Sequence, residues 1–463
     1  MYNVPTNFIN EQKVWNTLEK NKNPESSRIK EVLAKASEMK GLNISDVAVL
    51  TRISDPEMLG ELFYTANHVK EIIYGKRLVV FAPLYISNLC ANECLYCAFR
   101  ATNKDIVRSV LSQEHIANEV KALISTGQKR VLLVAGESYP RQGFQYVLDS
   151  IKTIYEVKTE HGEVRRVNVN VAPLKHEEFK ELKSYGIGTY QIFQETYHRE
   201  TYLKVHLGGK KRDYNWRAWS LHRAMEAGID DVGIGVLFGL FDYRFEILAM
   251  MQHINELEDK FGVGPHTVSV PRLEPATNSD LASHPPFPVS DIDFRKIVAI
   301  LRLAVPYTGI IMSTRETAKM RRETFALGVS QISAGSKTNP GGYEEEDAVS
   351  GQFSLGDHRS LDEVIRDVAK MGYIPSFCTA CYRLGRTGQD FMDLAKPGDI
   401  RLHCGPNALS SFKEYLQNYA SAETVKVGDK LIRETISGMT GLAKQRAEKL
   451  VKRVEAGKDD VYC

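Results

Sequence analysis

Six of the seven cysteines fall into two groups whose spacing suits metal chemistry. The first group, Cys90, Cys94 and Cys97, spans eight residues with the pattern Cys-x3-Cys-x2-Cys. Thiolates are soft ligands that suit iron–sulfur clusters and zinc. Three such ligands can hold three corners of a cubane cluster and leave the fourth iron open for a small molecule. A structural zinc site is the alternative, but such sites usually take four protein ligands, and no fourth follows nearby.

The second group lies near the end of the sequence. Cys378, Cys381 and Cys404 have the pattern Cys-x2-Cys-x22-Cys. Taken alone, this pattern favours zinc, because His403 beside Cys404 could complete a Cys3His site. If the first group holds an iron–sulfur cluster, a second cluster with one open iron becomes the preferred interpretation. Cys463 is expected to be a free thiol, because chain termini are usually poorly ordered.

The elements that must position these cysteines form a repeating pattern from about residue 70. Short β-rich runs alternate with amphipathic helical stretches, which predicts a parallel sheet whose crossover helices cover its faces. About eight such units favour a closed (β/α)8 barrel over an open doubly wound sheet. The predicted strands are Leu78–Ser87, Val131–Gly136, Val167–Ala172, Thr189–Thr196, Asp231–Leu240, Thr267–Pro275, Gly309–Glu316 and Gly328–Gly335. Cys90 therefore follows the first strand, at the end of the barrel where active sites are built.

Three domains are predicted around this pattern. Residues 1–65 read as an N-terminal helical extension, because charged and apolar residues alternate there at helical spacing. Residues 66–356 form the α/β barrel, and residues 357–463 form a mostly helical C-terminal domain that carries the second cysteine group. The glycine-rich and acidic segment Gly341–Gly356 is predicted to be a loop or linker between barrel and tail.

Charge and hydropathy exclude several classes of protein. The chain has 463 residues with 60 Lys+Arg and 58 Asp+Glu, so its formal net charge is only +2. This balance argues against a nucleic-acid binder held mainly by phosphate contacts. The longest apolar runs, Leu78–Ile86 and Val232–Phe241, are far shorter than a membrane-spanning helix needs. The start of the sequence lacks the pattern of a signal peptide, which favours a cytoplasmic location without membrane contact.

The first cysteine group and its surroundings resemble the radical S-adenosylmethionine (SAM) enzymes. Tyr96 takes the aromatic place in Cys-x3-Cys-x-aromatic-Cys after the first strand. The resemblance implies a [4Fe-4S] cluster that binds SAM, with further SAM contacts in a fixed order along the chain. These are a Gly-Gly-Glu-like element at Ala135, Gly136 and Glu137, an acid at Glu195, a partner for the SAM carboxylate at Arg217, and a stretch against adenine at Gly233 and Gly235. Alanine at position 135 departs from the first glycine of that element.

Residues 70 to 345 are similar to the aromatic amino acid lyase branch of this family. The branch includes the tyrosine lyase of thiamine biosynthesis, 2-iminoacetate synthase, and the [FeFe]-hydrogenase maturase family HydG. The cysteine tail resembles HydG. That resemblance implies cleavage of L-tyrosine to p-cresol and dehydroglycine, and conversion of dehydroglycine to carbon monoxide and cyanide at an auxiliary cluster of [4Fe-4S] type, with or without an extra iron. The product would be an Fe(CO)(CN) precursor of the hydrogenase H-cluster.

The resemblance also implies partners. They are the substrate L-tyrosine, free cysteine, an electron donor of the flavodoxin or ferredoxin type, and the maturation proteins HydE and HydF. Two other functions remain open. A plain tyrosine lyase of the 2-iminoacetate synthase type would use the tail cysteines for a structural metal. An iron–sulfur scaffold or electron carrier would perform no radical chemistry.

Four residues at predicted strand ends are candidates for binding tyrosine. Arg315 is the first candidate for the substrate carboxylate, and Arg272 is the second. Ser333 and Ser336 could bond the same group. The alternative for either arginine is a structural ion pair with the nearby Glu274 or Glu316.

His266, just before the sixth predicted strand, is matched to a histidine that HydG is thought to use for the extra iron. His403 competes with it for this role.

Overall fold

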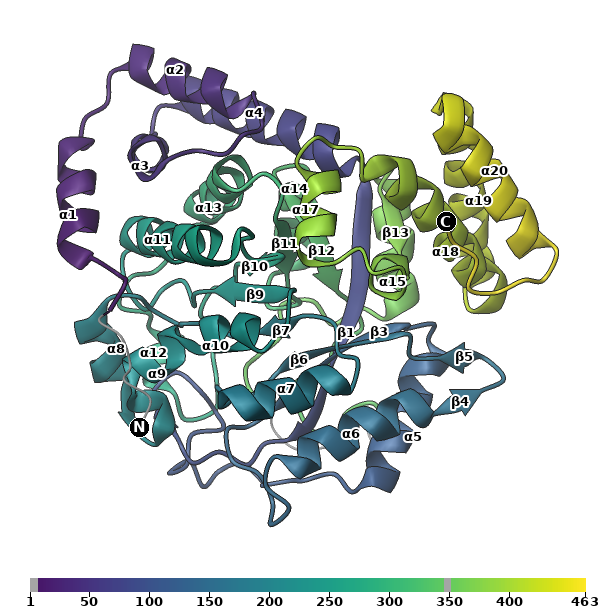
Figure 1. The fold of residues 1–463 in the computed structure, drawn as a ribbon, viewed down its shortest axis with the longest axis horizontal. Coiled ribbons are helices and arrows are strands. Elements are labelled where there is room, and N and C mark those ends of the chain that lie inside the picture. Colours follow the sequence, from purple (N-terminus) through teal and green to yellow (C-terminus); the bar gives the residue numbers. More distant parts are fainter. Residues whose placement is uncertain (1–6, 345–350) are drawn as a thin grey trace.

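Eight parallel strands form a closed barrel in the computed structural model, which describes residues 7–344 and 351–463 (Figure 1). Strand β1 pairs with both β3 and β12, and this last pairing closes the sheet. The predicted barrel is therefore confirmed, and the open doubly wound sheet is excluded. The barrel strands are β1 (Arg77–Ser87), β3 (Arg130–Ala135), β6 (Arg166–Asn170), β7 (Tyr190–Gln191), β9 (Val232–Gly235), β10 (Thr267–Ser269), β11 (Gly309–Met312) and β12 (Val329–Ser333).

Several strands are shorter than predicted. Where the sequence suggested strands over Thr189–Thr196 and Asp231–Leu240, the regular ladders cover only β7 and β9. Beyond them a single bridge joins Glu195 to Val236. Glu195 has a φ of 70°, a left-handed conformation that few residues other than glycine adopt and that ends a regular strand. Such strain is found at functional sites, and here it turns a carboxylate toward the barrel mouth.

Crossover helices surround the barrel, and their starts are set by capping side chains. Ser112 and Ser290 each accept a hydrogen bond from a backbone N–H of the first turn that follows. The helices bury one apolar face against the sheet. They are α5 (Gln113–Ser125), α6 (Gln145–Glu156), α7 (His176–Ser184), α10 (Ser220–Glu226), α11 (Tyr243–Phe261), α13 (Asp291–Ala304) and α14 (Ala318–Phe325), with short helices α8 (Arg199–Val205), α9 (Tyr214–Ala218) and α12 (Asp280–Ser283) between them.

The N-terminal helices lie against one side of the barrel. They are α1 (Glu11–Lys20), α2 (Ser26–Ala36), α3 (Ile44–Thr51) and α4 (Pro56–Tyr74). Helix α4 packs on α13, and α1 packs on α11 (Figure 1). Because α4 continues to Tyr74, three residues before β1, the helical extension runs directly into the first barrel strand.

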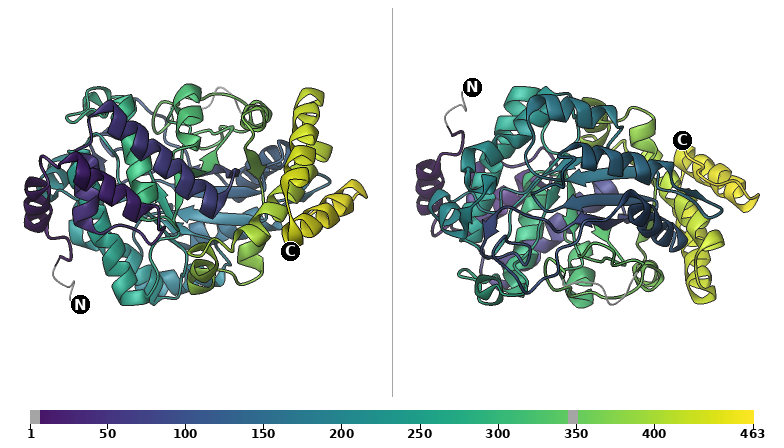
Figure 2. Two further views of the ribbon diagram at one scale, coloured as in Figure 1. Left: turned by 90° about the horizontal axis from the view of Figure 1, so that it is seen from above. Right: turned by 90° about the horizontal axis from the view of Figure 1, so that it is seen from below.

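The C-terminal segment is mostly helical but adds one strand to the sheet. Strand β13 (Ile374–Ser376) pairs in parallel with β1, so that Arg77 lies opposite Ile374. This strand was not predicted from the sequence, because it is short and has Pro375 at its centre. Proline is tolerated there because β13 is an edge strand. The helices are α15 (Leu361–Lys370), α16 (Ala380–Arg383), α17 (Gly388–Ala395), α18 (Arg401–Asn418), α19 (Ala422–Gly438) and α20 (Gly441–Glu455), of which the last two project to one side (Figure 2).

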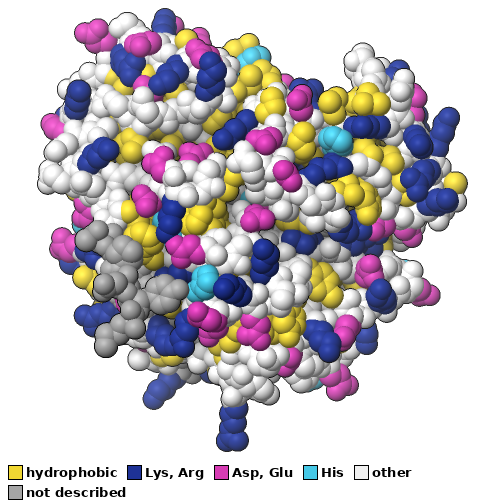
Figure 3. All heavy atoms as spheres, in the orientation of Figure 1, with side chains coloured by type: hydrophobic (Ala, Val, Ile, Leu, Met, Phe, Trp, Pro, Cys, Tyr) yellow, Lys and Arg dark blue, Asp and Glu magenta, His cyan; other side chains and the backbone are white. Residues whose placement is uncertain are grey.

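The predicted linker is only partly described, since residues 345–350 lie outside the described ranges. Residues 351–356 run across the loops at the carboxyl ends of the strands, where Gly356 N–H donates to the Thr314 carbonyl at 2.9 Å. Basic and acidic side chains are interspersed over the visible face (Figure 3). Within the described residues, no helix is long and apolar enough to cross a membrane.

Candidate active site and second cysteine site

The first three cysteines line a cavity at the carboxyl mouth of the barrel. Their loop follows β1 and is held by a two-stranded ribbon, in which β2 (Glu93–Cys94) pairs with β8 (His206–Gly208). The buried Tyr96 hydroxyl lies 2.8 Å from Nε2 of His206, which fixes the aromatic residue between the second and third cysteines. Burial raises the pKa of the Cys97 thiol to about 11. Cys90, Cys94 and Cys97 thus lie together in one cavity.

Gly136 is where the Gly-Glu element touches the cysteine loop. Its N–H donates to the Ser87 carbonyl at 2.9 Å. A Cβ at position 136 would lie 2.0 Å from the Leu89 carbonyl oxygen, so only glycine fits. Ala135, by contrast, is accommodated with its side chain at the cavity wall. The two positions therefore differ in the residues they tolerate. A neighbouring backbone leaves no room for a side chain at Gly136, whereas Ala135 has room for its methyl group.

Glu137, Glu195 and Arg217 meet beside the cysteines in one charged network. Arg217 lies 2.8 Å from Glu137 and 3.4 Å from Glu195, and its Nε donates to the Phe193 carbonyl. Although burial opposes ionisation, Arg217 lowers the pKa of Glu137 below its ordinary value. All three charged side chains line the cavity. The network therefore offers two carboxylates that could bind an ammonium group and one guanidinium that could bind a carboxylate. An amino acid carries both of these charged groups.

Sequence reasoning missed two members of this network, Lys211 and Asn92. Lys211 lies 2.7 Å from Glu195, and the Asn92 amide donates to Glu137 at 2.8 Å. The sequence did contain a feature that could have pointed to Lys211, namely the run of basic residues that follows Gly208 and Gly209. A Cβ at position 209 would lie 2.2 Å from the Asn92 side-chain oxygen, so this glycine lets the Lys211 loop approach the cysteine loop.

Gly233 and Gly235 lie on β9 but do not line the cavity among the described residues. A Cβ at Gly233 would lie 2.7 Å from the Gln191 side chain, and one at Gly235 would lie 3.0 Å from the Phe193 ring. The two glycines therefore make room for Gln191 on β7 and for Phe193 just beyond it, and both of these side chains line the cavity.

The candidate tyrosine ligands separate into two groups. Arg315 and Ser333 line the cavity, and the Arg315 guanidinium stacks on Phe353, 3.2 Å from the ring centroid. No ion pair of Arg315 is found within residues 7–344 and 351–463. Arg272 instead pairs with Glu316 and with Asp291 at 2.9 Å.

Ser336 is buried outside this cavity, and its hydroxyl lacks a hydrogen-bond partner in the described part of the chain.

The second cysteine group lines another cavity at the opposite end of the barrel. Cys378 follows β13, while Cys381 and Cys404 lie on α16 and α18. Contact with Cys381, together with Arg77, Arg386 and Arg130, lowers the pKa of Cys404. The three arginines line the same cavity and would offset the negative charge of cluster thiolates.

The two candidate histidines lie in different places. His266 lines the second cavity, with its Nδ1 buried, 3.6 Å from Asp231 and without a hydrogen bond in the described residues. Burial lowers the pKa of His266, which favours the neutral form that binds metals. His403 lies outside the cavity, 3.5 Å from a guanidinium nitrogen of Arg446. Only His266 therefore faces the space shared by the tail cysteines.

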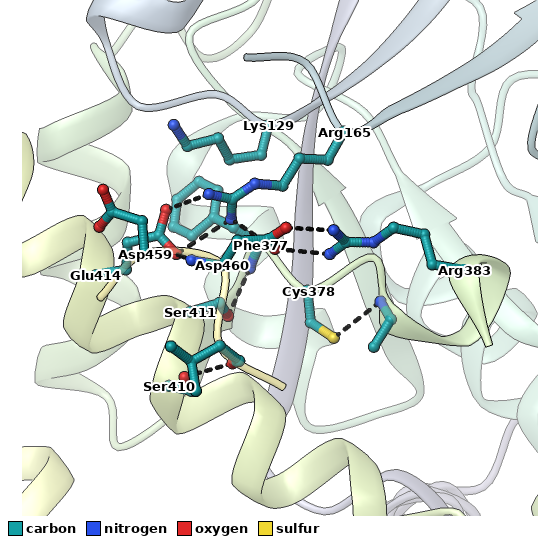
Figure 4. A network of polar contacts seen from close by, with 12 residues as sticks. Lys129, Arg165, Phe377, Cys378, Arg383, Ser410, Ser411, Glu414, Asp459 and Asp460 are labelled. Carbon is teal, nitrogen blue, oxygen red and sulfur yellow. Dashed lines mark hydrogen bonds and ion pairs between the residues drawn. The ribbon is translucent and has the colours of Figure 1, made fainter. Parts of the chain in front are cut away.

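A charged network joins the tail to the barrel beside Cys378 (Figure 4). Arg165, just before β6, lies 2.6 Å from Glu414 on α18 and 3.3 Å from Asp460. Arg383 on α16 also binds Asp460, with one contact at 2.7 Å. The segment near the end of the chain also contacts α18 directly, where the Ser410 hydroxyl donates to the Val461 carbonyl at 2.7 Å.

The two cavities are lined by neighbouring positions of the same barrel strands. On four strands, one residue lines the second cavity and the residue two positions later, which faces the same way, lines the first. The pairs are Val79 and Phe81 on β1, Arg130 and Leu132 on β3, Gly309 and Ile311 on β11, and Gln331 and Ser333 on β12. The barrel interior therefore lies directly between the two cysteine sites.

Both sites fit iron–sulfur clusters by the chemistry of their donors. Each offers three cysteines around one cavity, and the second adds the unpartnered His266 Nδ1 and Asp231 Oδ2. No three His, Cys, Asp or Glu side chains of the described residues converge on one metal ion. The assignment of a cluster to each site thus rests on three cysteines that line the same cavity. A closed parallel barrel with such a cysteine loop at its carboxyl mouth has the architecture of a radical SAM enzyme.

Comparisons with known proteins agree with this architecture. Residues 84–254 match the family model "Radical SAM superfamily", and residues 269–374 match "Biotin and Thiamin Synthesis associated domain". The 2-iminoacetate synthase of Escherichia coli (strain K12) is 33% identical over 352 residues, covering 75% of this chain and 90% of that protein.

Two solved structures are similar over nearly the whole chain. A crystal structure of HydG, described as a maturase of the [FeFe]-hydrogenase, has 48% identity and a TM-score of 0.95, covering 98% of this chain and 100% of that one. The maturase HydG from Carboxydothermus hydrogenoformans has 42% identity and a TM-score of 0.83, covering 95% and 97%. The chain belongs to the radical SAM enzymes and, among them, to the HydG family.

Proposed function

We propose that this protein cleaves the Cα–Cβ bond of L-tyrosine and then converts the two-carbon fragment to carbon monoxide and cyanide for an Fe(CO)(CN) precursor of the hydrogenase H-cluster. The atoms balance in both stages. Tyrosine, C9H11NO3, gives p-cresol, C7H8O, and dehydroglycine, C2H3NO2. Dehydroglycine holds the atoms of CO, HCN and H2O. An electron donor of the flavodoxin or ferredoxin type and the maturation proteins HydE and HydF are the proposed partners.

One observation carries the two-stage function, namely that the two cysteine sites adjoin cavities lined by neighbouring inward-facing positions of the same barrel strands. On this proposal, a small, reactive fragment released at the carboxyl mouth would pass to the tail site through the barrel interior and would not enter bulk water. A structural metal in the tail would have no need to face the barrel. The 48% identity to a HydG structure over 98% of the chain supports the same function.

At the first site, the chain holds and shields the reactants. Cys90, Cys94 and Cys97 would hold a [4Fe-4S] cluster, and bound SAM would supply a 5′-deoxyadenosyl radical at this mouth. Glu137, Glu195 and Arg217, which line the same cavity, would bind the charged groups of SAM. The barrel wall excludes water from a species that would otherwise react with it.

Arg315 is the proposed partner of the tyrosine carboxylate, because it lines this cavity and has no ion pair in the described residues. A hydrogen bond to a charged group contributes about 1.5–3 kcal/mol. We therefore expect Arg315→Met to lower kcat/KM for tyrosine by about 10- to 100-fold. Arg272→Met should instead lower the free energy of unfolding, because it leaves the buried Glu316 unpaired.

At the second site, Cys378, Cys381 and Cys404 would hold the auxiliary cluster. His266 is the proposed protein ligand of an extra iron, because its unpartnered Nδ1 faces this cavity. Free cysteine is a further small-molecule candidate there, since Arg77, Arg130 and Arg386 could pair with its carboxylate.

The deciding experiment is anaerobic infrared spectroscopy of the reconstituted protein with SAM, dithionite, cysteine and ¹³C-labelled L-tyrosine. Isotope-shifted bands of iron-bound CO and CN are expected together with p-cresol. Cys378→Ser should abolish these bands and leave p-cresol formation intact, whereas Cys90→Ser should abolish both. Cys463→Ser is the matched cysteine control and should leave both unchanged. Persistence of the cyanide band in the Cys378→Ser protein would refute the role of the tail site.

A plain tyrosine lyase is the second candidate, favoured by the 33% identity to 2-iminoacetate synthase. It predicts p-cresol with no CO or CN band in the same experiment. An electron carrier without radical chemistry predicts no 5′-deoxyadenosine when SAM and reductant are supplied.

A further inference from the structure

A short segment, the 351–356 strap, crosses the mouth of the first cavity and is held at both ends. Gln352 N–H donates to the Thr338 carbonyl at 2.9 Å, and Ser354 N–H donates to the Pro275 carbonyl at 2.8 Å. A Cβ at Gly351 would lie 2.2 Å from Thr338, and one at Gly356 would lie 2.3 Å from the Arg315 carbonyl oxygen. The strap therefore lies in direct backbone contact with the loops that follow three different strands.

The Gln352 side chain points from this strap toward the cysteine loop. Its Nε2 lies 3.7 Å from the Sγ of Cys97, within hydrogen-bond range for sulfur. Its Oε1 accepts a hydrogen bond of 2.8 Å from the buried Tyr85 hydroxyl. A cluster-bound thiolate can only accept a hydrogen bond, so the NH2 group of the amide faces Cys97, and the Tyr85 hydroxyl donates to the Oε1 atom at the other side. The Gln352 carbonyl also accepts from Ala98 N–H at 3.4 Å, which ties the strap to the cysteine loop.

We propose that Gln352 is a positioning residue that sets the reduction potential of the cluster at Cys90, Cys94 and Cys97 through its hydrogen bond to the Cys97 sulfur. The proposal rests on the assignment of a cluster to these cysteines, and it is independent of which substrate the enzyme cleaves. Hydrogen bonds to cluster sulfurs are among the features that set such potentials. A donor stabilises the reduced state more than the oxidised state, since reduction adds negative charge to the cluster.

The consequence is a defined order of potentials among variants. Gln352→Met keeps the length of the side chain but removes the donor, so the midpoint potential should fall. Gln352→Glu places a carboxylate beside the thiolate and should lower it further. Tyr85→Phe frees the amide to turn over and should give a value between wild type and Gln352→Met. A tenfold loss in the reduction equilibrium, our expectation for Gln352→Met, corresponds to 59 mV for one electron.

The test is an EPR-monitored redox titration of the full-length, fully reconstituted protein without tyrosine. The signal of this cluster is distinguished from that of the tail site by its change on addition of SAM. Gln145→Met, on the exposed side of α6, is the matched control and should not shift the potential. A Gln352→Met potential equal to wild type at equal iron content, or a Gln352→Glu potential above it, would overturn the proposal.

A second measurement needs no variant. Wild-type protein labelled with ¹⁵N in glutamine side chains should show a ¹⁵N coupling in the pulsed EPR spectrum of the reduced, SAM-responsive cluster. Absence of that coupling would also overturn the proposal. A protein that passes both tests but forms no p-cresol would refute the tyrosine lyase function and leave the role of Gln352 in place.

Discussion

Replacing Gly136 with alanine is the sharpest test of how the barrel positions its first cysteine site. The added Cβ would lie 2.0 Å from the Leu89 carbonyl oxygen and 2.7 Å from its carbonyl carbon. Cβ contacts below 3.0 Å essentially never occur, so the two backbones must separate by at least 1.0 Å. Leu89 immediately precedes Cys90, and the displacement therefore acts directly on a cluster ligand. A misplacement of about 1 Å can lower a rate about 100-fold.

We expect Gly136→Ala to lower the rate of 5′-deoxyadenosine formation by about 100-fold. The assay is anaerobic SAM cleavage with excess dithionite, with iron and sulfide content measured on the same samples. Gly60→Ala in α4 is the matched control, because a Cβ there meets no atom within 4 Å. Ala135→Gly restores the diglycine of the family and should keep near wild-type activity. A Gly136→Ala protein with full iron content and wild-type SAM cleavage would refute the reasoning.

The remaining predictions concern stability. Lys70 is fully buried over the Tyr373 ring, and burial lowers its pKa from 10.5 to about 7. The unfolded chain therefore binds more protons between pH 7 and 10.5, so stability should rise with pH across this window. Lys70→Met should remove that slope and raise the free energy of unfolding at pH 7 by up to about 4 kcal/mol, which urea titrations at several pH values can measure. Arg165→Met leaves the buried Glu414 unpaired and should cost about 3–5 kcal/mol, whereas breaking the exposed Lys158–Glu163 pair should cost less than about 1 kcal/mol in the same titration.

The sequence carried enough information to predict the barrel and both cysteine sites. Strand–helix alternation has a clear hydrophobic period, and cysteine spacing is a local property, so both are readable without coordinates. Glu137, Glu195 and Arg217 were also found from sequence, and the structure brings both carboxylates within hydrogen-bond distance of Arg217. The roles assigned to them toward SAM stay predictions.

Features that depend on contacts between distant segments could not be predicted in this way. Arg315 and Arg272 both follow barrel strands and look equivalent in sequence. In the structure, Arg272 forms ion pairs with Glu316 and Asp291, and these carboxylates do not pair with Arg315. Gln352 lies 255 residues from Cys97 in a segment that composition marks as a linker. β13 also escaped prediction, because an edge strand of three residues around a proline has no periodic signal.

The long first strand explains how one barrel can serve two separate sites. β1 has 11 residues and supports the tail through β13 at its start and the first cysteine loop at its end. At about 3.3 Å per residue, the strand separates these ends by roughly 33 Å. Yet residues two apart in its first half, Val79 and Phe81, line the two different cavities. The two cysteine groups are therefore held at opposite ends of one strand, while the cavities that adjoin them are lined by neighbouring positions of that strand.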